Sequence, residues 1–298
     1  MAPGGIELDF SGPFSLRAAA GFGFGPNVGR QAPSLRLAFP VDGESEDGYA
    51  GVVLHQEADD APVRAEIDLG HPDTDPEIVV RQVRRILSLD HDGLGFAAVG
   101  DRDPVLGRLQ RAHPGQRPVL FPSPYEAAAW SVISARRRSA QAAETRKAIA
   151  RELGRTFALA GEELAAFPQP DRLLGVEPGP GLPPEKVERL RGIARAALAG
   201  ELDAGVLAEL GPERALAQLQ LLRGIGPFYA GLIVLRAVGF ADAMLSAPEP
   251  KGLTHLARYY DLGPDPDPAA VAAITDGWRP FRTWALVLVR LAGDRGTA

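Results

Sequence analysis

The chain has 298 residues, of which 45% are hydrophobic and 23% charged, with a formal net charge of −6 and no cysteine. The lack of cysteine excludes disulfides, thiolate zinc sites, iron–sulfur clusters and a cysteine nucleophile. No segment approaches the ~18 uninterrupted apolar residues of a membrane span, and the N-terminus lacks the basic head and apolar run of a signal peptide. We therefore expect a soluble, cytoplasmic protein of two domains.

The charge is unevenly divided along the chain. Residues 1–110 hold 9 Arg against 18 Asp and Glu, whereas the remainder holds 23 basic and 20 acidic residues. Seven basic residues and three glutamates lie between positions 123 and 155. Such an asymmetry indicates nucleic-acid contact, but a solvated helix face gives the same pattern, so charge alone leaves both open.

Short apolar runs bounded by Gly, Pro and Asp predict strands in the N-terminal part. They cover residues 6–10, 13–22, 34–40, 49–57 and 62–70. The Gly-rich segment 21–29 lacks the GxGxxG spacing and is expected to form a turn between strands. From Asp75 the spacing becomes helical, which predicts a helix that opens at Pro76 and stops by Gly93, and a second one over 105–110.

After Pro124 nearly the whole chain is predicted to be helical. Ser123 is a suitable N-cap for a first helix, YEAAAWSVIS, which carries one apolar stripe. Further helices are predicted at 139–153, 184–199, 212–222, 227–239, 250–260, 268–277 and 279–293. The fold class is therefore α+β, with a strand-rich domain over residues 1–115 and a helical domain over 116–298.

The segment AQLQLLRGIGPFYAGLIVLRAVG, residues 217–239, is the most specific part of the sequence. Gly224 and Gly226 flank one aliphatic residue, Ile225, so that the chain reverses tightly between two helices. The amides at the start of the second helix are then unpaired and lie at its positive end, where a phosphate oxygen fits. This arrangement grips a DNA strand without reading its sequence. An ordinary αα-hairpin with capping glycines is the alternative.

Two further motifs follow in order. SAPEPKGL places Glu249 between two prolines, and WRPFRTWA opens a final apolar helix. With the glycine hairpin, these motifs closely resemble the helix–hairpin–helix DNA glycosylase superfamily, and specifically its 3-methyladenine DNA glycosylase II branch. The resemblance implies an N-terminal antiparallel β-sheet domain with flanking helices, and a helical catalytic domain with the hairpin at about 212–239.

The resemblance implies a catalytic role for Glu249, which stands at or within one residue of the carboxylate position of the family, where the usual residue is aspartate. Breaking an N-glycosidic bond builds positive charge on the deoxyribose, and a nearby carboxylate stabilises that charge or orients the attacking water. Asp242 lies too close to the hairpin helix for this role. The alternative is that Glu249 only supplies a first-turn negative charge to the next helix, worth under ~1 kcal/mol.

The resemblance also implies DNA contacts by Gly224, Ile225 and Gly226. Backbone carbonyls of Gln220, Leu222 and Ile225 are expected to form a site for a structural Na⁺ or K⁺, with no other cofactor. Phe228 stands where strand-cutting members carry a Schiff-base lysine, so no lyase activity is expected.

This sequence departs from the family at the DNA wedge and in the base pocket. Arg136, Arg137 and Arg138 replace the usual Gln and apolar wedge, and are expected to contact DNA. The base pocket is expected to contain Phe228, Tyr125, Trp130, Arg290 and Arg282. Arg290 replaces a tryptophan, which weakens stacking on an alkylated base. Arg282 is expected to brace the carboxylate loop, and Trp278 and Trp284 are expected to be core aromatics.

The sequence therefore predicts a monofunctional DNA glycosylase of base excision repair that hydrolyses the bond of a damaged base, an N-alkylated purine, in duplex DNA. Its expected partner is damaged double-stranded DNA, with no membrane association, a monomeric state and a place at the bacterial nucleoid. The alternatives are a non-catalytic helix–hairpin–helix protein that senses distorted duplex and a purely structural αα-hairpin protein.

Overall fold

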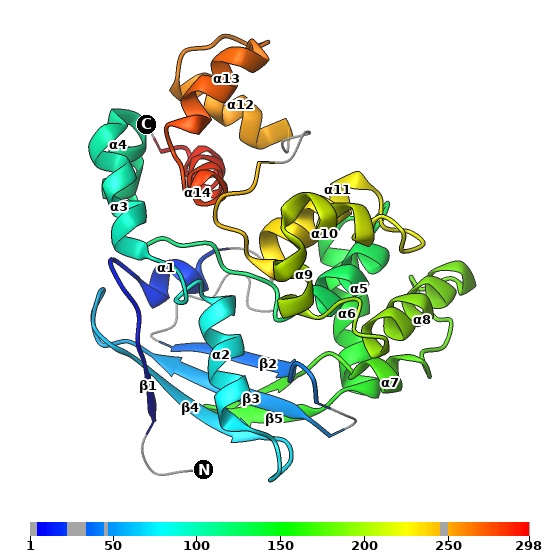
Figure 1. Cartoon of the computed structure of the whole chain (residues 1–298). Helices are drawn as coiled ribbons and strands as arrows, with labels where there is room; N and C mark the ends of the chain where they lie inside the picture. The colour runs from blue at the N-terminus through cyan, green and yellow to red at the C-terminus, as the bar shows by residue number, and fades with distance from the viewer. Residues whose placement is uncertain (1–4, 23–33, 45–46, 245–249, 298) are drawn as a thin grey trace.

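The computed structural model describes residues 5–22, 34–44, 47–244 and 250–297. It is an α+β fold in which a small antiparallel sheet lies against helices, and the sheet is at the bottom of Figure 1. The helices within residues 124–238 lie above and to the right of the sheet, and the helices within residues 250–294 lie at the top. The predicted fold class is therefore confirmed.

The N-terminal sheet has the strand order β1-β4-β3-β2, with antiparallel neighbours throughout. Its strands are β1 (Ile6–Leu8), β2 (Ser34–Pro40), β3 (Tyr49–His55) and β4 (Val63–Leu69). Leu37 pairs with Val52, and Val52 pairs with Ile67, so all three lie on one face. This face packs on helices α1 (Leu16–Ala20) and α2 (Pro76–Ile86).

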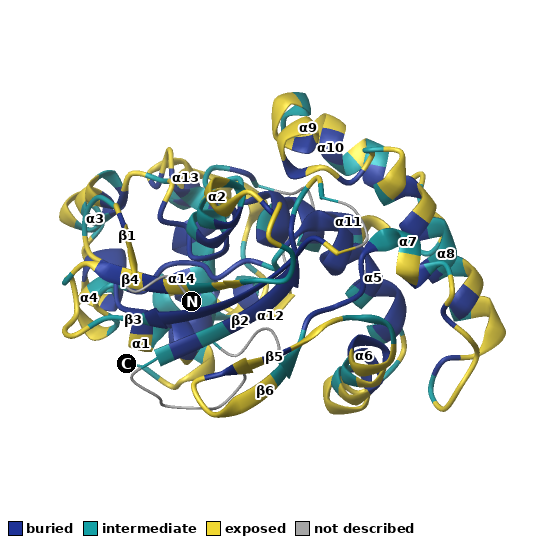
Figure 2. Ribbon diagram, turned by 90° about the horizontal axis from the view of Figure 1, so that it is seen from below, coloured by how far each residue is buried: buried dark blue, intermediate teal, exposed yellow. Residues whose placement is uncertain are grey.

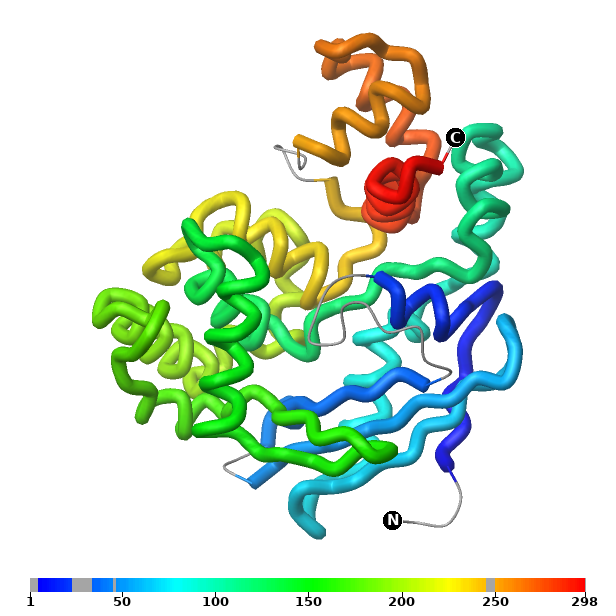
Figure 3. Tube along the Cα trace, turned by 180° about the vertical axis from the view of Figure 1, so that it is seen from behind, coloured from blue at the N-terminus to red at the C-terminus, as the bar shows by residue number. Residues whose placement is uncertain are grey.

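A hairpin of two short strands, β5 (Thr156–Leu159) and β6 (Glu162–Ala165), covers the opposite face of the sheet. It is seen against β2 and β3 in Figure 3. A methyl group on Gly51 would lie 2.7 Å from the Phe157 ring, so glycine lets the hairpin approach β3 closely. This hairpin was not among the elements expected from the sequence.

Two expectations for the N-terminal part are wrong. Residues 13–22, predicted as a strand, contain helix α1, because the Ser15 hydroxyl caps the Ala18 amide and the alanine-rich run favours a helix. Gly93 does not stop a helix but begins α3 (Gly93–Arg102), which Asp92 caps. The expected turn at 21–29 lies largely outside the described residues.

The helices of the central part surround α5 (Pro124–Ser134), whose N-cap is Ser123 as predicted. They are α6 (Ser139–Leu153), α7 (Pro170–Leu173), α8 (Pro184–Leu198), α9 (Ala204–Leu210), α10 (Pro212–Leu219), α11 (Pro227–Ile233) and the π-helical turn η1 (Val234–Val238). Figure 2 shows α5 as buried and the outer faces of α6 and α8 as exposed. The π-turn gives the hairpin's second helix its last five residues before Gly239.

A third hydrophobic cluster joins distant parts of the chain. α3 and α4 (Pro104–Ala112) pack against α12 (Pro250–Tyr259) and α14 (Arg282–Asp294), and α13 (Pro268–Asp276) adds its apolar side. Trp278 and Trp284 are buried in this cluster, which confirms that they are core aromatics. The division into domains at residues 115 and 116 stays a prediction. Among the described helices, none is long and apolar enough to cross a membrane.

Candidate DNA interface and catalytic site

The glycine hairpin has the geometry that its sequence predicts. Gly224 has φ of +98°, which lets the chain reverse after α10 without strain. Ile225 is 3% exposed and packs in the helical core, while its amide donates to the Leu222 carbonyl at 3.0 Å. The hairpin therefore has a fixed shape that its one aliphatic side chain holds against the core.

Gly226 presents its backbone at the edge of this hairpin. It caps α11 without any side-chain hydrogen bond, and a methyl group placed on it would meet no atom within 4 Å. Within the described ranges, no hydrogen bond joins the amides of Gly226 or Phe228 to an acceptor. Phe228 and Leu221, on the two sides of the turn, are 61% and 85% exposed. Open amides at a helix start are the feature that binds phosphate oxygens.

The carbonyls expected to hold a cation also lie in this turn. The Leu222 carbonyl accepts from the Ile225 amide, whereas the carbonyls of Gln220 and Ile225 accept no hydrogen bond from another described residue. Carbonyl oxygens with free lone pairs are suitable ligands for a monovalent cation, so the donor set fits the expected ion.

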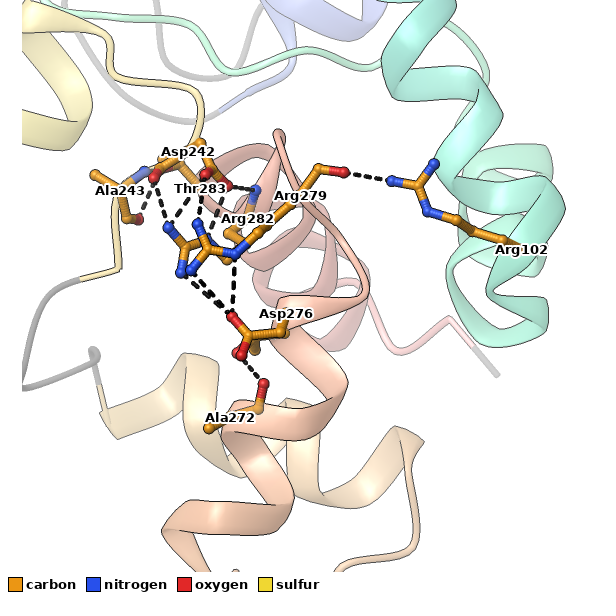
Figure 4. Close-up of polar contacts among 9 residues, drawn as sticks. Arg102, Asp242, Ala243, Ala272, Asp276, Arg279, Arg282 and Thr283 are labelled. Carbon is orange, nitrogen blue, oxygen red and sulfur yellow. Dashed lines mark hydrogen bonds and ion pairs between the residues drawn. The ribbon is translucent and has the colours of Figure 1, made fainter.

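After the hairpin, the chain is clamped onto the N-terminus of α14, as Figure 4 shows. Arg282 Nε donates to Asp242 Oδ1 at 2.8 Å and its Nη2 donates to Oδ2 at 3.1 Å, while the Arg282 amide also donates to Oδ1 at 3.2 Å. The Thr283 hydroxyl donates to the Ala243 carbonyl at 2.8 Å and accepts from its amide at 3.0 Å. These bonds fix residues 242 and 243, which lead into the segment that carries Glu249.

Glu249 itself lies outside the described residues, between Met244 and Pro250, the first residue of α12. Its catalytic role stays a prediction. Arg282 is half-buried and binds Asp242, seven positions before Glu249, and its role in bracing the carboxylate stays a prediction. The sequence excludes Asp242 as the catalytic carboxylate by its spacing from the hairpin, and that spacing does not reveal a partner forty residues away.

The arginine turn, residues 135–138, follows α5. Arg136 is exposed with φ of +57°, and Arg138 is exposed at the start of α6. Arg137 is half-buried and donates to the Gly181 carbonyl at 2.6 Å and to the Thr145 hydroxyl at 2.9 Å. Of the three arginines predicted to bind DNA, two are therefore open to solvent, and Arg137 is engaged by the protein.

Lys186 of α8 holds the end of α5 from which this turn begins. Its Nζ donates to the carbonyls of Ile133 and Ala135, at 2.7 and 2.9 Å, which are at the C-terminal end of α5. Burial lowers the pKa of Lys186, and the positive charges of Arg137 and Arg189 lower it further. This residue was missed from sequence because its contacts span more than fifty positions.

The residues predicted to form the base pocket have different surroundings. Tyr125 is buried in the helical core, where its hydroxyl donates to the Pro168 carbonyl at 2.9 Å, and burial raises its pKa. Trp130 is half-buried against the same core. Phe228 is exposed, and its ring meets Tyr229 edge-on at 5.3 Å. Of this set, Phe228 has the largest free surface for a base.

Arg290 lies on α14, where it forms an ion pair with Asp294. His255 of α12 lies 3.2 Å from the same carboxylate. The Asp294 charge therefore offsets the positive charge of Arg290.

No protein-family model matches the chain. It is 25% identical over 214 residues to the DNA-3-methyladenine glycosylase of Bacillus subtilis, and the aligned region covers 70% of this chain and 70% of that protein. It is 28% identical over 187 residues to DNA-3-methyladenine glycosylase 2 of Escherichia coli, which covers 61% of this chain and 62% of that protein.

Among solved structures, the fold is similar to that of a 3-methyladenine DNA glycosylase from Archaeoglobus fulgidus, with a TM-score of 0.77 and 20% identity. The match covers 98% of this chain and 99% of that structure, including the N-terminal sheet. These similarities confirm the resemblance to the helix–hairpin–helix DNA glycosylase superfamily and its 3-methyladenine DNA glycosylase II branch that the hairpin and WRPFR motifs indicate, and the solved structure shares the fold.

Proposed function

We propose that this protein is a monofunctional DNA glycosylase of base excision repair that releases N-alkylated purines from duplex DNA. The observation that carries the proposal is the path of the chain after the hairpin. The open edge at Gly226 leads through η1 to residues 242 and 243, which α14 clamps just before the Glu249 segment. The hairpin proposed to hold a DNA strand and the proposed carboxylate are therefore joined by one short, continuous segment of the protein.

The hairpin would bind one DNA strand through its backbone. The amides of Gly226 and Phe228 donate to a phosphate oxygen, and the absence of a side chain at Gly226 lets the backbone approach it. A Na⁺ or K⁺ held by the carbonyls of Gln220, Leu222 and Ile225 would add positive charge beside the same phosphate. Arg136 and Arg138, exposed in the turn that follows α5, would supply further contacts.

Glu249 is the residue to which we assign the hydrolysis. The bond between C1′ and the purine nitrogen breaks with its electron pair going to the base, so that a positively charged alkylated purine leaves as a neutral molecule. Water adds to C1′, and the Glu249 carboxylate stabilises the sugar cation and accepts the proton that water gives up. Because the leaving base already carries a positive charge, no acid is needed to protonate it.

The absence of lyase activity is part of the proposal. Phe228 stands at the position of the Schiff-base lysine, and the nearest lysine in sequence is Lys251, which is exposed on α12. Without an amine at the sugar no imine forms, so the product is an intact strand with an abasic site. Borohydride treatment during turnover is expected to trap no covalent complex between protein and DNA.

The test is an excision assay on duplexes that each carry one alkylated, deaminated or oxidised base. Wild type is expected to release N-alkylated purines, and Glu249→Gln to lose about 10²-fold or more of that rate. Binding of both proteins to a duplex with an abasic-site analogue is the control, and it should be the same within twofold. Binding without release across the whole panel would instead support the non-catalytic DNA sensor.

A further inference from the structure

Helix α8 connects the two elements proposed to contact DNA. It packs on α5, and its first turns carry Lys186 and Arg189. Lys186 bonds to the end of α5 just before the arginine turn. Arg189 lies against the hairpin, because a methyl group on Gly224 would be 2.9 Å from its Cδ. One helix therefore places a positive charge beside each element.

Lys186 lies near two other cations, Arg137 and Arg189, whose charges lower its pKa. Arg137 and Lys186 are held by backbone carbonyls. Arg189 has a different environment, since it pairs with the carboxylate of Glu185, one turn earlier. Its Nε is buried and makes no hydrogen bond to a described residue.

The ion pair of Arg189 and Glu185 allows Arg189 to exchange the Glu185 carboxylate for a phosphate. The Glu185 side chain is 65% exposed, and the Arg189 side chain is 28% exposed. A partly exposed ion pair of this kind at i,i+4 contributes little to stability. A phosphate offers the guanidinium a stronger, bidentate partner. The aliphatic part of Arg189 is already fixed against Gly224, so little side-chain entropy is lost when the partner changes.

We propose that Arg189 is a phosphate ligand beside the hairpin, and that Glu185 is the counter-ion it releases when DNA binds. The inference rests on the proposed function, because it needs the hairpin to bind a DNA strand. Glu185 then acts as an internal competitor of the phosphate and lowers the affinity of the protein for DNA.

The experiment measures the dissociation constant for an abasic-site duplex over about 50–200 mM salt. Arg189→Met keeps the aliphatic contact with Gly224 and removes the charge. We expect the slope of log K against log salt to fall by about 0.9, as for the loss of one phosphate contact. Arg189→Lys should keep that slope, and Glu185→Gln should raise the affinity about twofold.

A second pair on α8 gives the matched control. Glu188 pairs with Arg191 at 2.8 Å, and Arg191 is held by the carbonyls of Leu174 and Val176. Glu188→Gln removes the same charge from the same helix and is expected to leave the affinity unchanged. The gain from Glu185→Gln should also vanish in the Arg189→Met background.

The proposal is overturned if Arg189→Met keeps the wild-type slope, or if Glu188→Gln and Glu185→Gln raise the affinity equally. In both cases wild type would still bind DNA and release bases, so the proposed function would stand. If wild type itself shows no salt-dependent DNA binding, the proposed function fails first, and this inference fails with it.

Discussion

Arg282 grips Asp242 with both its side chain and its backbone. The guanidinium meets both carboxylate oxygens, the amide meets one of them, and Nη2 also donates to the Asp242 carbonyl at 3.0 Å. The two residues are forty positions apart: Asp242 lies shortly after the second helix of the hairpin, and Arg282 begins α14. This contact therefore fixes the position of the chain between the hairpin and Glu249.

Removing this contact is expected to lower both stability and catalysis. Asp242→Ala leaves the Arg282 guanidinium, which is 14% exposed, without its main partner, and we expect a loss of about 1–3 kcal/mol in the free energy of unfolding. The rate of base release should fall further than DNA affinity does, because the chain that leads to Glu249 loses its anchor at Asp242. Urea unfolding, single-turnover excision and binding to an abasic duplex measure the three quantities.

Arg279 provides the control, since it contacts the same carboxylate at 3.2 Å but is 54% exposed. Arg279→Ala should cost less than about 1 kcal/mol. Equal losses from Arg279→Ala and Asp242→Ala would contradict an anchoring role for the Arg282 bond.

Much of the fold was predictable because it depends on local signals. Helix α6 has the predicted bounds, 139–153, and α8 and α12 each end one residue earlier than predicted. The β5–β6 hairpin was missed because its four-residue strands are stabilised by contact with the sheet and by the space at Gly51, which no local pattern reveals. The error at α1 has a different origin, because the signals there are local: Ser15 is an N-cap and the alanine-rich run favours a helix.

The site shows the same division. The hairpin was found because its glycines and Ile225 are adjacent in sequence and their geometry is local. The contacts of Asp242 with Arg282, and of Lys186 with the end of α5, join distant segments and have no local pattern. A single sequence predicts which residues bind a strand, but not which residues hold them in place.

Gly226→Ala is expected to separate binding from stability. The residue has φ of −87°, and an added methyl group meets no atom within 4 Å, so the folded protein accommodates alanine without strain. In the complex the methyl group would stand between the amide and a phosphate, and we expect a loss of about 1.5–3 kcal/mol in binding free energy. The measurements are the melting temperature and the dissociation constant for an abasic duplex.

Gly224→Ala is the matched comparison, because it fails for the opposite reason. The φ of +98° and the 2.9 Å approach to Arg189 Cδ should cost the folded protein about 1–2 kcal/mol. If Gly226→Ala lowered the melting temperature while leaving DNA affinity intact, the hairpin edge would not be the phosphate contact.

Glu126 is expected to make stability depend on pH. Burial raises the pKa of this carboxyl above its ordinary value of 4.5, although the charge of Arg146 opposes this effect. The folded state therefore holds the proton more tightly than the unfolded state, and the resulting stability is present below pH 4.5 and is lost as pH rises through the folded-state pKa. A tenfold difference in proton affinity between the two states corresponds to about 1.4 kcal/mol of stability.

Urea unfolding of wild type and Glu126→Gln at several pH values between about 4.5 and 7 isolates this group, because all other titrations are shared. The free energy of unfolding of wild type, relative to that of Glu126→Gln, should rise as the pH is lowered. A relative fall toward acid pH would show that the charge of Arg146 outweighs the effect of burial on the pKa of Glu126.

Phe228 is expected to contribute to base release without contributing to stability. Its ring is 61% exposed, so truncation removes little packing from the folded protein. Stacking of an aromatic ring on a base contributes about 1–3 kcal/mol, and Phe228→Ala should lose a corresponding part of the excision rate, while Phe228→Trp retains it. Leu221→Ala is the control, because that side chain is 85% exposed on the other side of the turn. Equal losses from Leu221→Ala and Phe228→Ala would indicate a general apolar contact with DNA, because only a stacking role distinguishes the ring from an aliphatic side chain.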